Sequence, residues 1–403
     1  MTGHKSAITR RRFLQTSAAG VSAATIVPRS VLGQGQTPPS EEFGGALVGC
    51  GGRGGATFKG MGPNVRMVAQ CDVKFVGRAD DKTLYADYRR LMERKDIDVV
   101  AIATPPHWHA LVSIAAMESG KDVLCEKPMT RFIAEGRAVV EAEQRYNRIF
   151  QIGTYGRFGA SRNTHKIMAS GLLKKCEAVH IAKGGYNVRK YCGMVRYDVA
   201  PIPKSLNWDM YCGPSPMRPF NRQRFGGTHR YYWDYEGGGL GDFGQHKFDG
   251  PQYAYAKDYT SPVEIEAYAP PQHPEAAGLW GWVEARYADG LTFVMDSGEW
   301  GKPYDRKKPR GVSEADLSEE DREKLKQMPD PEPLVKFPEA IRTRKQAGGH
   351  AEASHRCATL LHLGNIAIRC GRKIHYDPVK EEIIGDEEAN RLVYQPMRAP
   401  CRL

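Results

Sequence analysis

The stretch Gly45-Ala46-Leu47-Val48-Gly49-Cys50-Gly51-Gly52-Arg53-Gly54 decides the fold of the first part of this chain. Its first four residues form a short apolar run typical of a strand, and the last six form a G-x-G-x-x-G pattern. Such glycines allow a tight turn and let backbone amides approach a pyrophosphate. The pattern predicts a dinucleotide-binding turn. A glycine loop with a purely structural purpose is the alternative.

The residues after the turn strengthen the dinucleotide prediction. A second apolar run, Val65 to Cys71, ends in Asp72, 18 residues past Gly54. An acid at this place accepts hydrogen bonds from the two ribose hydroxyls and repels a 2′-phosphate. We therefore expect NAD, with NADP kept open by the nearby Lys74 and Arg78.

Two further apolar runs predict the rest of a nucleotide-binding sheet. Residues 98–104 and 122–125 are strand-like and almost continuously apolar, and residues 111–119 between them have a helical pattern. Buried parallel strands have this composition, and alternating strands and helices with short connections give a doubly wound sheet. The first domain is therefore predicted to be a Rossmann-type α/β domain.

The pattern changes after about residue 151. Residues 179–183, 263–268, 282–287 and 292–296 alternate apolar with polar side chains, as strands with one covered face do. Residues 355–369 are apolar at helical spacing. We expect an α+β second domain built on an open, largely antiparallel sheet, followed by a long helix.

Several motifs together resemble the glucose–fructose oxidoreductase / inositol dehydrogenase (Gfo/Idh/MocA) family. They are Asp96 to His109 (DIDVVAIATPPHWH), Gly120 to Pro128 (GKDVLCEKP), Gly237 to His246 (GGGLGDFGQH), Asp377-Pro378 and Gly385 to Asn390. The resemblance runs from about Gly45 to the C-terminus. It implies an NAD(P)-dependent oxidoreductase with Lys127, Asp242 and His246 as catalytic residues. It also implies a cofactor site made by Gly49, Gly51, Gly52, Arg53, Gly54, Asp72, Thr104, Pro105, His109, Glu126 and Lys127.

The chemistry of the three catalytic candidates agrees with this resemblance. A lysine beside a nicotinamide can donate to the substrate oxygen and stabilise developing negative charge. Asp242 and His246 are four residues apart, so on a helix they share one face, where the carboxylate can orient the imidazole as a proton acceptor. The alternatives are a solvated surface Lys127 and an ordinary helix-start Asp with a surface His.

Three further residues are candidates for substrate binding. Tyr232 and Trp233 belong to an aromatic run that could pack on the apolar face of a sugar, or pack in the core or in an oligomer interface. Arg157 could bind an anionic or polyol substrate, or be a surface charge. We expect no metal, although His107 and His109 flank Trp108, because no further cluster has ligand spacing.

The chain departs from the family in two places. Only 12 residues separate Asp72 from Tyr85, which predicts a more open adenosine side of the cofactor pocket. Pro106 stands where Asp or Asn is common, and a proline is acceptable at a helix start. We expect Pro106 to remove a side-chain cap and little else.

The N-terminus predicts an export signal. Arg10-Arg11-Arg12-Phe13-Leu14 and the weakly apolar run after it resemble a twin-arginine signal; a disordered basic tail is the alternative. Five of the 58 basic residues and no acid lie in residues 1–40, so the rest of the chain carries a net charge of +6. This excess is a weak argument for nucleic acid and a fair one for anionic substrates or cofactors. No stretch of 18 apolar residues predicts a membrane span.

These observations divide the 403 residues into five parts. We expect a twin-arginine export signal (1–33), a linker (34–42), a Rossmann domain (43–150), an α+β substrate and oligomerisation domain (151–345), and a C-terminal helix and tail packing back near the cleft (346–403). The predicted protein is periplasmic or otherwise exported by the twin-arginine machinery. We also expect a homo-oligomer, by resemblance.

The predicted function is hydride transfer between a tightly bound NAD, or NADP, and a sugar, polyol or sugar derivative. One alternative is a redox-neutral glycosidase or lyase that oxidises its glycoside transiently. A non-catalytic sugar sensor is the other.

Overall fold

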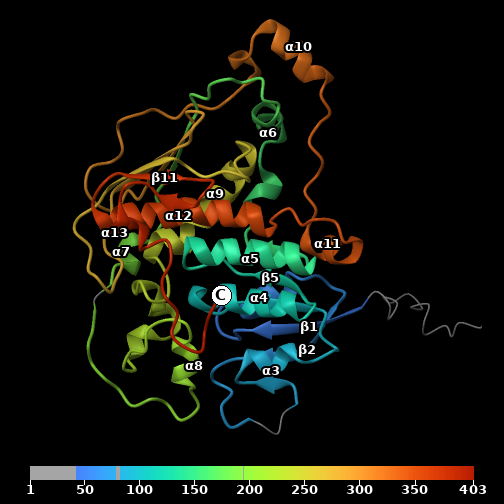
Figure 1. Cartoon of the computed structure of the whole chain (residues 1–403), viewed down its shortest axis with the longest axis vertical. Coiled ribbons are helices and arrows are strands. Elements are labelled where there is room, and N and C mark those ends of the chain that lie inside the picture. The colour runs from blue at the N-terminus through green and yellow to red at the C-terminus, as the bar shows by residue number, and fades with distance from the viewer. Residues whose placement is uncertain (1–41, 79–81, 194) are drawn as a thin grey trace, which may run out of the picture. The chain divides into compact units, whose positions relative to one another are not determined.

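The computed structural model describes residues 42–78, 82–193 and 195–403 (Figure 1). The predicted export signal, and all of the predicted linker except residue 42, lie outside the described residues. Residues 44–403 form one compact unit that contains two six-stranded sheets.

The first sheet is parallel and has the strand order β3-β2-β1-β4-β5-β6. Its strands are β1 (Phe43–Val48), β2 (Val65–Cys71), β3 (Leu84–Tyr85), β4 (Val99–Ile102), β5 (Asp122–Cys125) and β6 (Phe150–Ile152). All four residues of β4 and of β5 are buried, as expected for strands covered on both faces. The predicted doubly wound sheet is confirmed. Its order reverses between β1 and β4, where such sheets bind ligands beyond the carboxyl ends of the strands.

The second sheet has the order β12-β11-β8-β9-β10-β7 and corresponds to the sheet predicted for the second domain. Its strands are β7 (Val179–Lys183), β8 (Glu264–Tyr268), β9 (Trp282–Arg286), β10 (Thr292–Asp296), β11 (Ile374–Asp377) and β12 (Glu382–Ile383). Pairing is antiparallel except between β10 and β7, so the prediction of a largely antiparallel sheet is confirmed. The C-terminal tail contributes β11 and β12 to this sheet.

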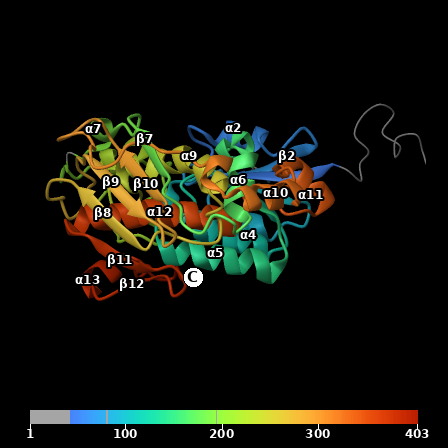
Figure 2. The same ribbon diagram turned by 90° about the horizontal axis from the view of Figure 1, so that it is seen from above.

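One long helix joins the two halves. The helix α12 (Ala351–Cys370) packs against α5 (Ile133–Tyr146) of the first domain and against α9 (Gly238–Ala254), β8 and β9 of the second. Figure 2 shows α12 running alongside the strands of the second sheet. Its residues enter both hydrophobic cores: Ala358 lies in the first and Leu361 in the second. We infer that α12 fixes the position of α9 against the first sheet.

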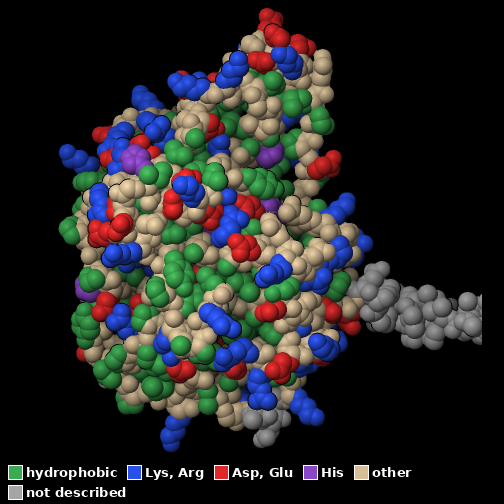
Figure 3. All heavy atoms as spheres, viewed as in Figure 1, with side chains coloured by type: hydrophobic (Ala, Val, Ile, Leu, Met, Phe, Trp, Pro, Cys, Tyr) green, Lys and Arg blue, Asp and Glu red, His purple; other side chains and the backbone are tan. Residues whose placement is uncertain are grey.

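The remaining elements are short. They are α2 (Gly54–Lys59), α3 (Tyr88–Met92), α4 (His109–Glu118), α6 (Arg162–Ala169), α7 (Val188–Tyr191), α8 (Trp208–Cys212), α10 (Glu319–Gln327), α11 (Phe337–Thr343), α13 (Glu387–Asn390) and the 3-10 turns Pro106–Trp108, Gly156–Gly159, Arg222–Arg224, Gly226–Tyr231 and Glu314–Asp316. Across the described ranges, no helix combines the length and the apolar character needed to cross a bilayer. On the face shown in Figure 3, basic and acidic side chains are interspersed.

Candidate active site

A cavity of about 680 Å³ lies between the carboxyl ends of the first sheet and the second domain. Its volume lies in the range of small-molecule and cofactor sites. The predicted site residues that line it are Gly49, Gly51, Gly52, Arg53, Asp72, Thr104, Pro105, Glu126, Lys127, Asp242 and His246. The structure therefore brings the glycine turn and the three catalytic candidates to one cavity.

The glycine turn has the geometry of a backbone cradle. Gly49 has φ +90°, and a Cβ there would lie 2.6 Å from the carbonyl carbon of Ala103. At Gly51 and Gly52 a Cβ would meet nothing within 4 Å, so both face open space in the cavity. Gly54 does not line the cavity; it begins α2, and a Cβ there would lie 2.4 Å from the Gly49 oxygen. The turn is therefore closely packed at Gly49 and Gly54 and open to the cavity at Gly51 and Gly52, where its backbone could approach a diphosphate.

Asp72 lies at one end of the cavity with its carboxylate fixed by the backbone. Its Oδ2 accepts a hydrogen bond from Cys50 N at 2.9 Å, and its Oδ1 accepts one from Lys74 N at 3.0 Å. A carboxylate oxygen can accept more than one hydrogen bond, so both remain able to accept from a ribose hydroxyl. Thr104 Oγ1, also on the cavity wall, is buried without a hydrogen-bond partner in the described chain. These residues fit a dinucleotide.

The Glu126-Lys127-Pro128 segment follows β5 and connects the glycine turn to the reactive lysine. Glu126 Oε1 accepts hydrogen bonds from Thr57 Oγ1 at 2.8 Å and Arg53 Nε at 3.2 Å. The Lys127–Pro128 peptide bond is cis. His109 does not line the cavity but is buried beneath this segment, with Nδ1 2.7 Å from the Pro128 oxygen and Nε2 2.8 Å from the Thr104 oxygen. His109 was predicted to bind the cofactor, and the structure does not bring it to the cavity; its ring lies instead between two backbone oxygens behind the wall.

Lys127 and Asp242 form a close ion pair. Lys127 Nζ donates to Asp242 Oδ1 at 2.5 Å and to the Asp242 backbone oxygen at 2.7 Å. Arg230 Nε lies 3.0 Å from the same Oδ1. Although burial opposes ionisation, the charges of Lys127 and Arg230 hold the pKa of Asp242 below its usual range. An ammonium has three donors, so one N–H of Lys127 remains for a substrate oxygen.

His246 lies one turn after Asp242 on α9 and is exposed to the cavity. Within the described chain no hydrogen bond joins it to Asp242, whose Oδ1 is directed instead to Lys127 and Arg230. We had expected Asp242 to orient the imidazole; the structure gives it the role of positioning Lys127. Partial burial, and then the charge of Lys127, lower the pKa of His246. The imidazole is therefore neutral near pH 7 and able to accept a proton.

The second domain lines the Asp72 end of the cavity. Met210, Tyr211, Phe225, Gly226 and Gly227 line the cavity. Their segment lies beside Asp72, because Asn207 N donates to the Val73 oxygen at 2.9 Å and Lys74 Nζ lies 5.2 Å from the centre of the Phe225 ring. The expectation of a more open adenosine side is therefore corrected: residues 207–230, which we call the strap, lie across it.

Three contacts from other segments hold the strap. His107 Nε2 lies 2.7 Å from the Tyr211 oxygen, and Trp108 Nε1 donates to the Met210 oxygen at 2.9 Å. Near the C-terminus, Arg398 Nη1 bonds Asp209 Oδ1 at 2.7 Å. No local sequence pattern predicts these contacts, because they join residues about 100 or more positions apart.

Arg157 does not reach the cavity, contrary to the substrate hypothesis. Its fully buried guanidinium pairs with Asp249 at 2.7 Å and Asp258 at 3.1 Å, and it donates to the Gly348 oxygen at 2.9 Å. A buried guanidinium with this many acceptors holds elements together.

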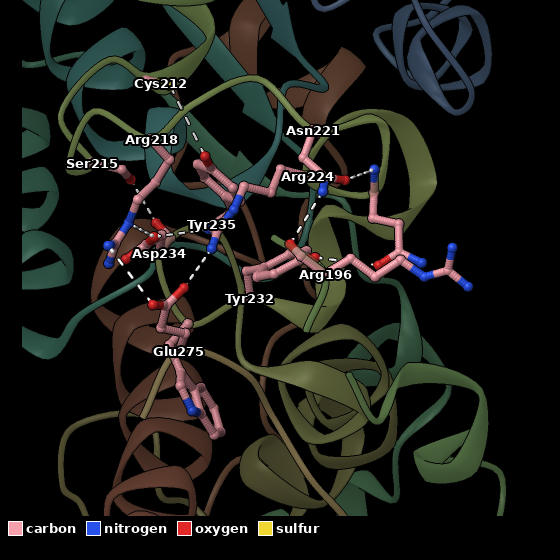
Figure 4. Close-up of polar contacts among 12 residues, drawn as sticks. Arg196, Cys212, Ser215, Arg218, Asn221, Arg224, Tyr232, Asp234, Tyr235 and Glu275 are labelled. Atoms are coloured by element: carbon pink, nitrogen blue, oxygen red, sulfur yellow. Dashed lines mark hydrogen bonds and ion pairs between the residues drawn. The ribbon is translucent and has the colours of Figure 1, made fainter. Parts of the chain in front are cut away.

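Tyr232 and Trp233 also lie outside the cavity wall, so the structure does not bring them to a substrate. Tyr232 is fully buried beneath Arg224, and Trp233 donates its Nε1–H to the His273 oxygen at 3.0 Å. Figure 4 shows the network around Tyr232, in which Arg218 and Arg224 pair with Asp234 and Glu275. Of the two uses weighed for these aromatic side chains, the structure shows core packing. The network ties Arg218 and Arg224, which belong to the strap, to Asp234 and Glu275 in the rest of the second domain.

Among the cavity residues that were not predicted are the polar side chains His229, Arg230 and Glu236. They flank the aromatic run at residues 231–235. The signal in the sequence that could have identified one of them is Glu236, a charged side chain directly before three glycines. Among the described residues no group of three or more His, Cys, Asp or Glu side chains could hold a metal ion.

Comparison with known proteins places this geometry in a family. Two family models match, one described as the oxidoreductase family NAD-binding Rossmann fold (residues 64–154) and one as its C-terminal alpha/beta domain (residues 159–403). The second alone covers more than half of the chain.

Individual relatives match over shorter stretches. Levoglucosan dehydrogenase of Pseudarthrobacter phenanthrenivorans is 37% identical over 89 residues, which are 22% of this chain and 23% of the relative. A glycosyl hydrolase family 109 protein of Stenotrophomonas maltophilia is 37% identical over 142 residues, 30% of each chain. The chain thus spans less than a third of the length of these relatives. The WlbA dehydrogenase of Bordetella pertussis, solved with NADH and UDP-GlcNAcA, shares the fold at 14% identity and a TM-score of 0.52, over 83% of this chain and 99% of that one. The Rossmann sheet, the second sheet and the two family models together show that this chain belongs to the Gfo/Idh/MocA oxidoreductase family.

Proposed function

We propose that the protein is an NAD-dependent oxidoreductase that oxidises a CH–OH group of a sugar, polyol or sugar derivative. The observation that carries this proposal is the convergence of Lys127, Asp242 and His246 on one cavity with the glycine turn and Asp72. The levoglucosan dehydrogenase relative supports a carbohydrate substrate. The fixed carboxylate of Asp72 favours NAD over NADP, since a 2′-phosphate there would face a negative charge.

The residues of the chain divide the reaction between them. The nicotinamide, when bound, supplies the acceptor for two electrons and the hydrogen of the carbinol carbon. Lys127 donates its remaining N–H to the substrate oxygen and stabilises the negative charge that develops there. His246 accepts the hydroxyl proton and, being exposed to the cavity, can pass it to water. Asp242 holds Lys127 in place, and Arg230 lies against the same carboxylate oxygen of Asp242.

The cofactor is proposed to stay bound through many turnovers. Between turnovers a second substrate that bears a carbonyl group must then take the hydride and return the bound cofactor to NAD, unless the reaction is redox-neutral. The strap crosses the Asp72 end of the cavity and is fastened at His107, Trp108 and Arg398. Export by the twin-arginine route, which carries folded proteins, would suit an enzyme that leaves the cytoplasm with its cofactor loaded. A homo-oligomer is proposed on the family resemblance alone.

The test begins with protein purified after export by its own signal. Mass spectrometry should find NAD, and a panel of sugars and polyols should raise absorbance at 340 nm in proportion to bound cofactor. The Lys127→Ala variant should keep the NAD and lose the absorbance change. Purified protein that holds no nicotinamide and binds NAD or NADP no better than millimolar would refute the proposal. Fractionation that leaves the protein in the cytoplasm would refute export.

A second candidate is a redox-neutral glycosidase or lyase, favoured by the family 109 glycosyl hydrolase relative. In this case the same residues oxidise a glycoside transiently, and the C–H next to the new carbonyl loses its proton as the leaving group departs. In a glycosidase, water then adds to the unsaturated carbonyl compound, and the hydride returns from the cofactor to the carbonyl. Release of 4-nitrophenol from nitrophenyl glycosides without net NADH would indicate this reaction. Net NADH without cleavage would indicate the dehydrogenase. A sugar sensor would keep its ligand response in Lys127→Ala.

A further inference from the structure

Glu236 is a buried carboxylate without the hydrogen bonds that such a group requires. It lies just before the glycines that lead into α9, lines the cavity and is 1% exposed. Neither of its carboxylate oxygens accepts a hydrogen bond from any residue in the described ranges. Leaving a buried polar group unpaired is unfavourable, and buried charges in folded proteins are normally paired and hydrogen-bonded. The missing donors therefore need a source outside the chain.

The neighbours of Glu236 limit what that source can be. Its Oε2 lies 3.0 Å from His229 Nε2 and 3.7 Å from Arg230 Nε, outside hydrogen-bond alignment in both cases. His229 Nδ1 lies 2.5 Å from the Gly226 oxygen, which fixes the ring. The guanidinium of Arg230 is thus already near Oε2, and a cationic ligand would meet it.

An anionic ligand is disfavoured for the opposite reason. Asp242 lines the same cavity, and its carboxylate already pairs with the cations Lys127 and Arg230. A carboxylate or phosphate on the ligand beside Glu236 would face two negative charges. Neutral hydroxyl groups are repelled neither by the nearby cation nor by the two carboxylates. A carboxylate can accept hydrogen bonds from two such groups at once.

We propose that Glu236 is the residue that recognises the substrate, accepting hydrogen bonds from hydroxyl groups next to the carbinol that is oxidised. The substrate is then a neutral polyhydroxyl compound, not a sugar acid, sugar phosphate or amino sugar. This inference rests on the proposed function and narrows its substrate class. The desolvated carboxylate would also reject analogues that lack the hydroxyl, because its oxygens would be left unpaired.

The experiment compares Glu236→Gln with Asp234→Asn in the full-length holoprotein. Asp234 is a matched control: it is a buried carboxylate two residues away, but its partners Arg218 and Arg224 both belong to the protein. If Glu236 serves a ligand, Glu236→Gln melts at or above the wild-type temperature without carbohydrate, since a buried carboxylate that lacks hydrogen bonds has been removed. Asp234→Asn melts lower.

Calorimetry supplies the second readout. Neutral carbohydrates, among them levoglucosan and myo-inositol, and the anions galacturonate and glucose 6-phosphate are titrated into each protein. We expect at least one neutral carbohydrate to bind the wild type and Asp234→Asn, and to bind Glu236→Gln at least 10-fold more weakly. The proposal is overturned if Glu236→Gln melts as low as the control, if its affinity equals that of the wild type, or if no neutral carbohydrate binds the wild type. Binding without reduction of the bound nicotinamide would refute the proposed oxidoreductase while leaving Glu236 as the recognition residue.

Discussion

The ion pairs of Arg157 offer a direct test of how the structure corrects the substrate hypothesis. In Arg157→Met the methionine fills much of the space, but Asp249 and Asp258 lose their cation. The side chains of Arg157 and Asp249 are both 0% exposed, so water cannot reach the Asp249 carboxylate to solvate it once the guanidinium is removed. Breaking such a buried pair costs about 3–5 kcal/mol. At about 2 °C per kcal/mol, the lower end for large domains, Tm should fall by about 6–10 °C.

Differential scanning calorimetry of the holoprotein measures this change, with Arg286→Met as the matched control. Arg286 pairs with Glu264 at 2.8 Å but is 46% exposed, and such surface pairs contribute about 0–1 kcal/mol. The control should therefore melt within about 2 °C of the wild type. If Arg157→Met melts like the control and binds carbohydrate more weakly, our interpretation of Arg157 is wrong and a substrate role must be restored.

Three further predictions concern the cavity. Lys127→Gln should lower the rate of reduction of bound nicotinamide by about 10²–10³-fold. The charge of Lys127 helps to lower the pKa of His246, so the acid limb of the pH–rate profile should also move to higher pH in this variant. An acid limb that does not move would contradict this coupling. Asp72→Ser should weaken NAD binding by about 10–100-fold, the loss expected for a hydrogen bond to a charged group, and weaken NADP binding less; equal losses in fluorescence titrations would argue against ribose recognition. Arg398→Gln removes one fastening of the strap, so bound nicotinamide should dissociate about 2–10-fold faster in a chase with excess analogue, and an unchanged rate would show that the strap does not retain the cofactor.

The three candidate catalytic residues differ in how well the sequence predicted them. Lys127 and His246 were located by motif, and the structure brings both to the cavity. The role of Asp242 was assigned from helical spacing, which indicates only which residues share a face. Arg230, from a different element, draws the carboxylate together with Lys127. Periodicity contains no information about such partners.

The sequence by itself determined the two sheets, the glycine turn and the segments that supply the reactive groups. Local patterns specify these features: apolar runs for buried strands, alternation for half-covered strands, and glycines where a side chain would collide with the backbone. Whether Arg157, Tyr232 and Trp233 face a ligand or the core was decided only by the tertiary structure. The same is true of the strap over the Asp72 end and the unpaired carboxylate of Glu236. Each depends on what lies opposite a side chain, and in a folded chain those neighbours come from distant segments.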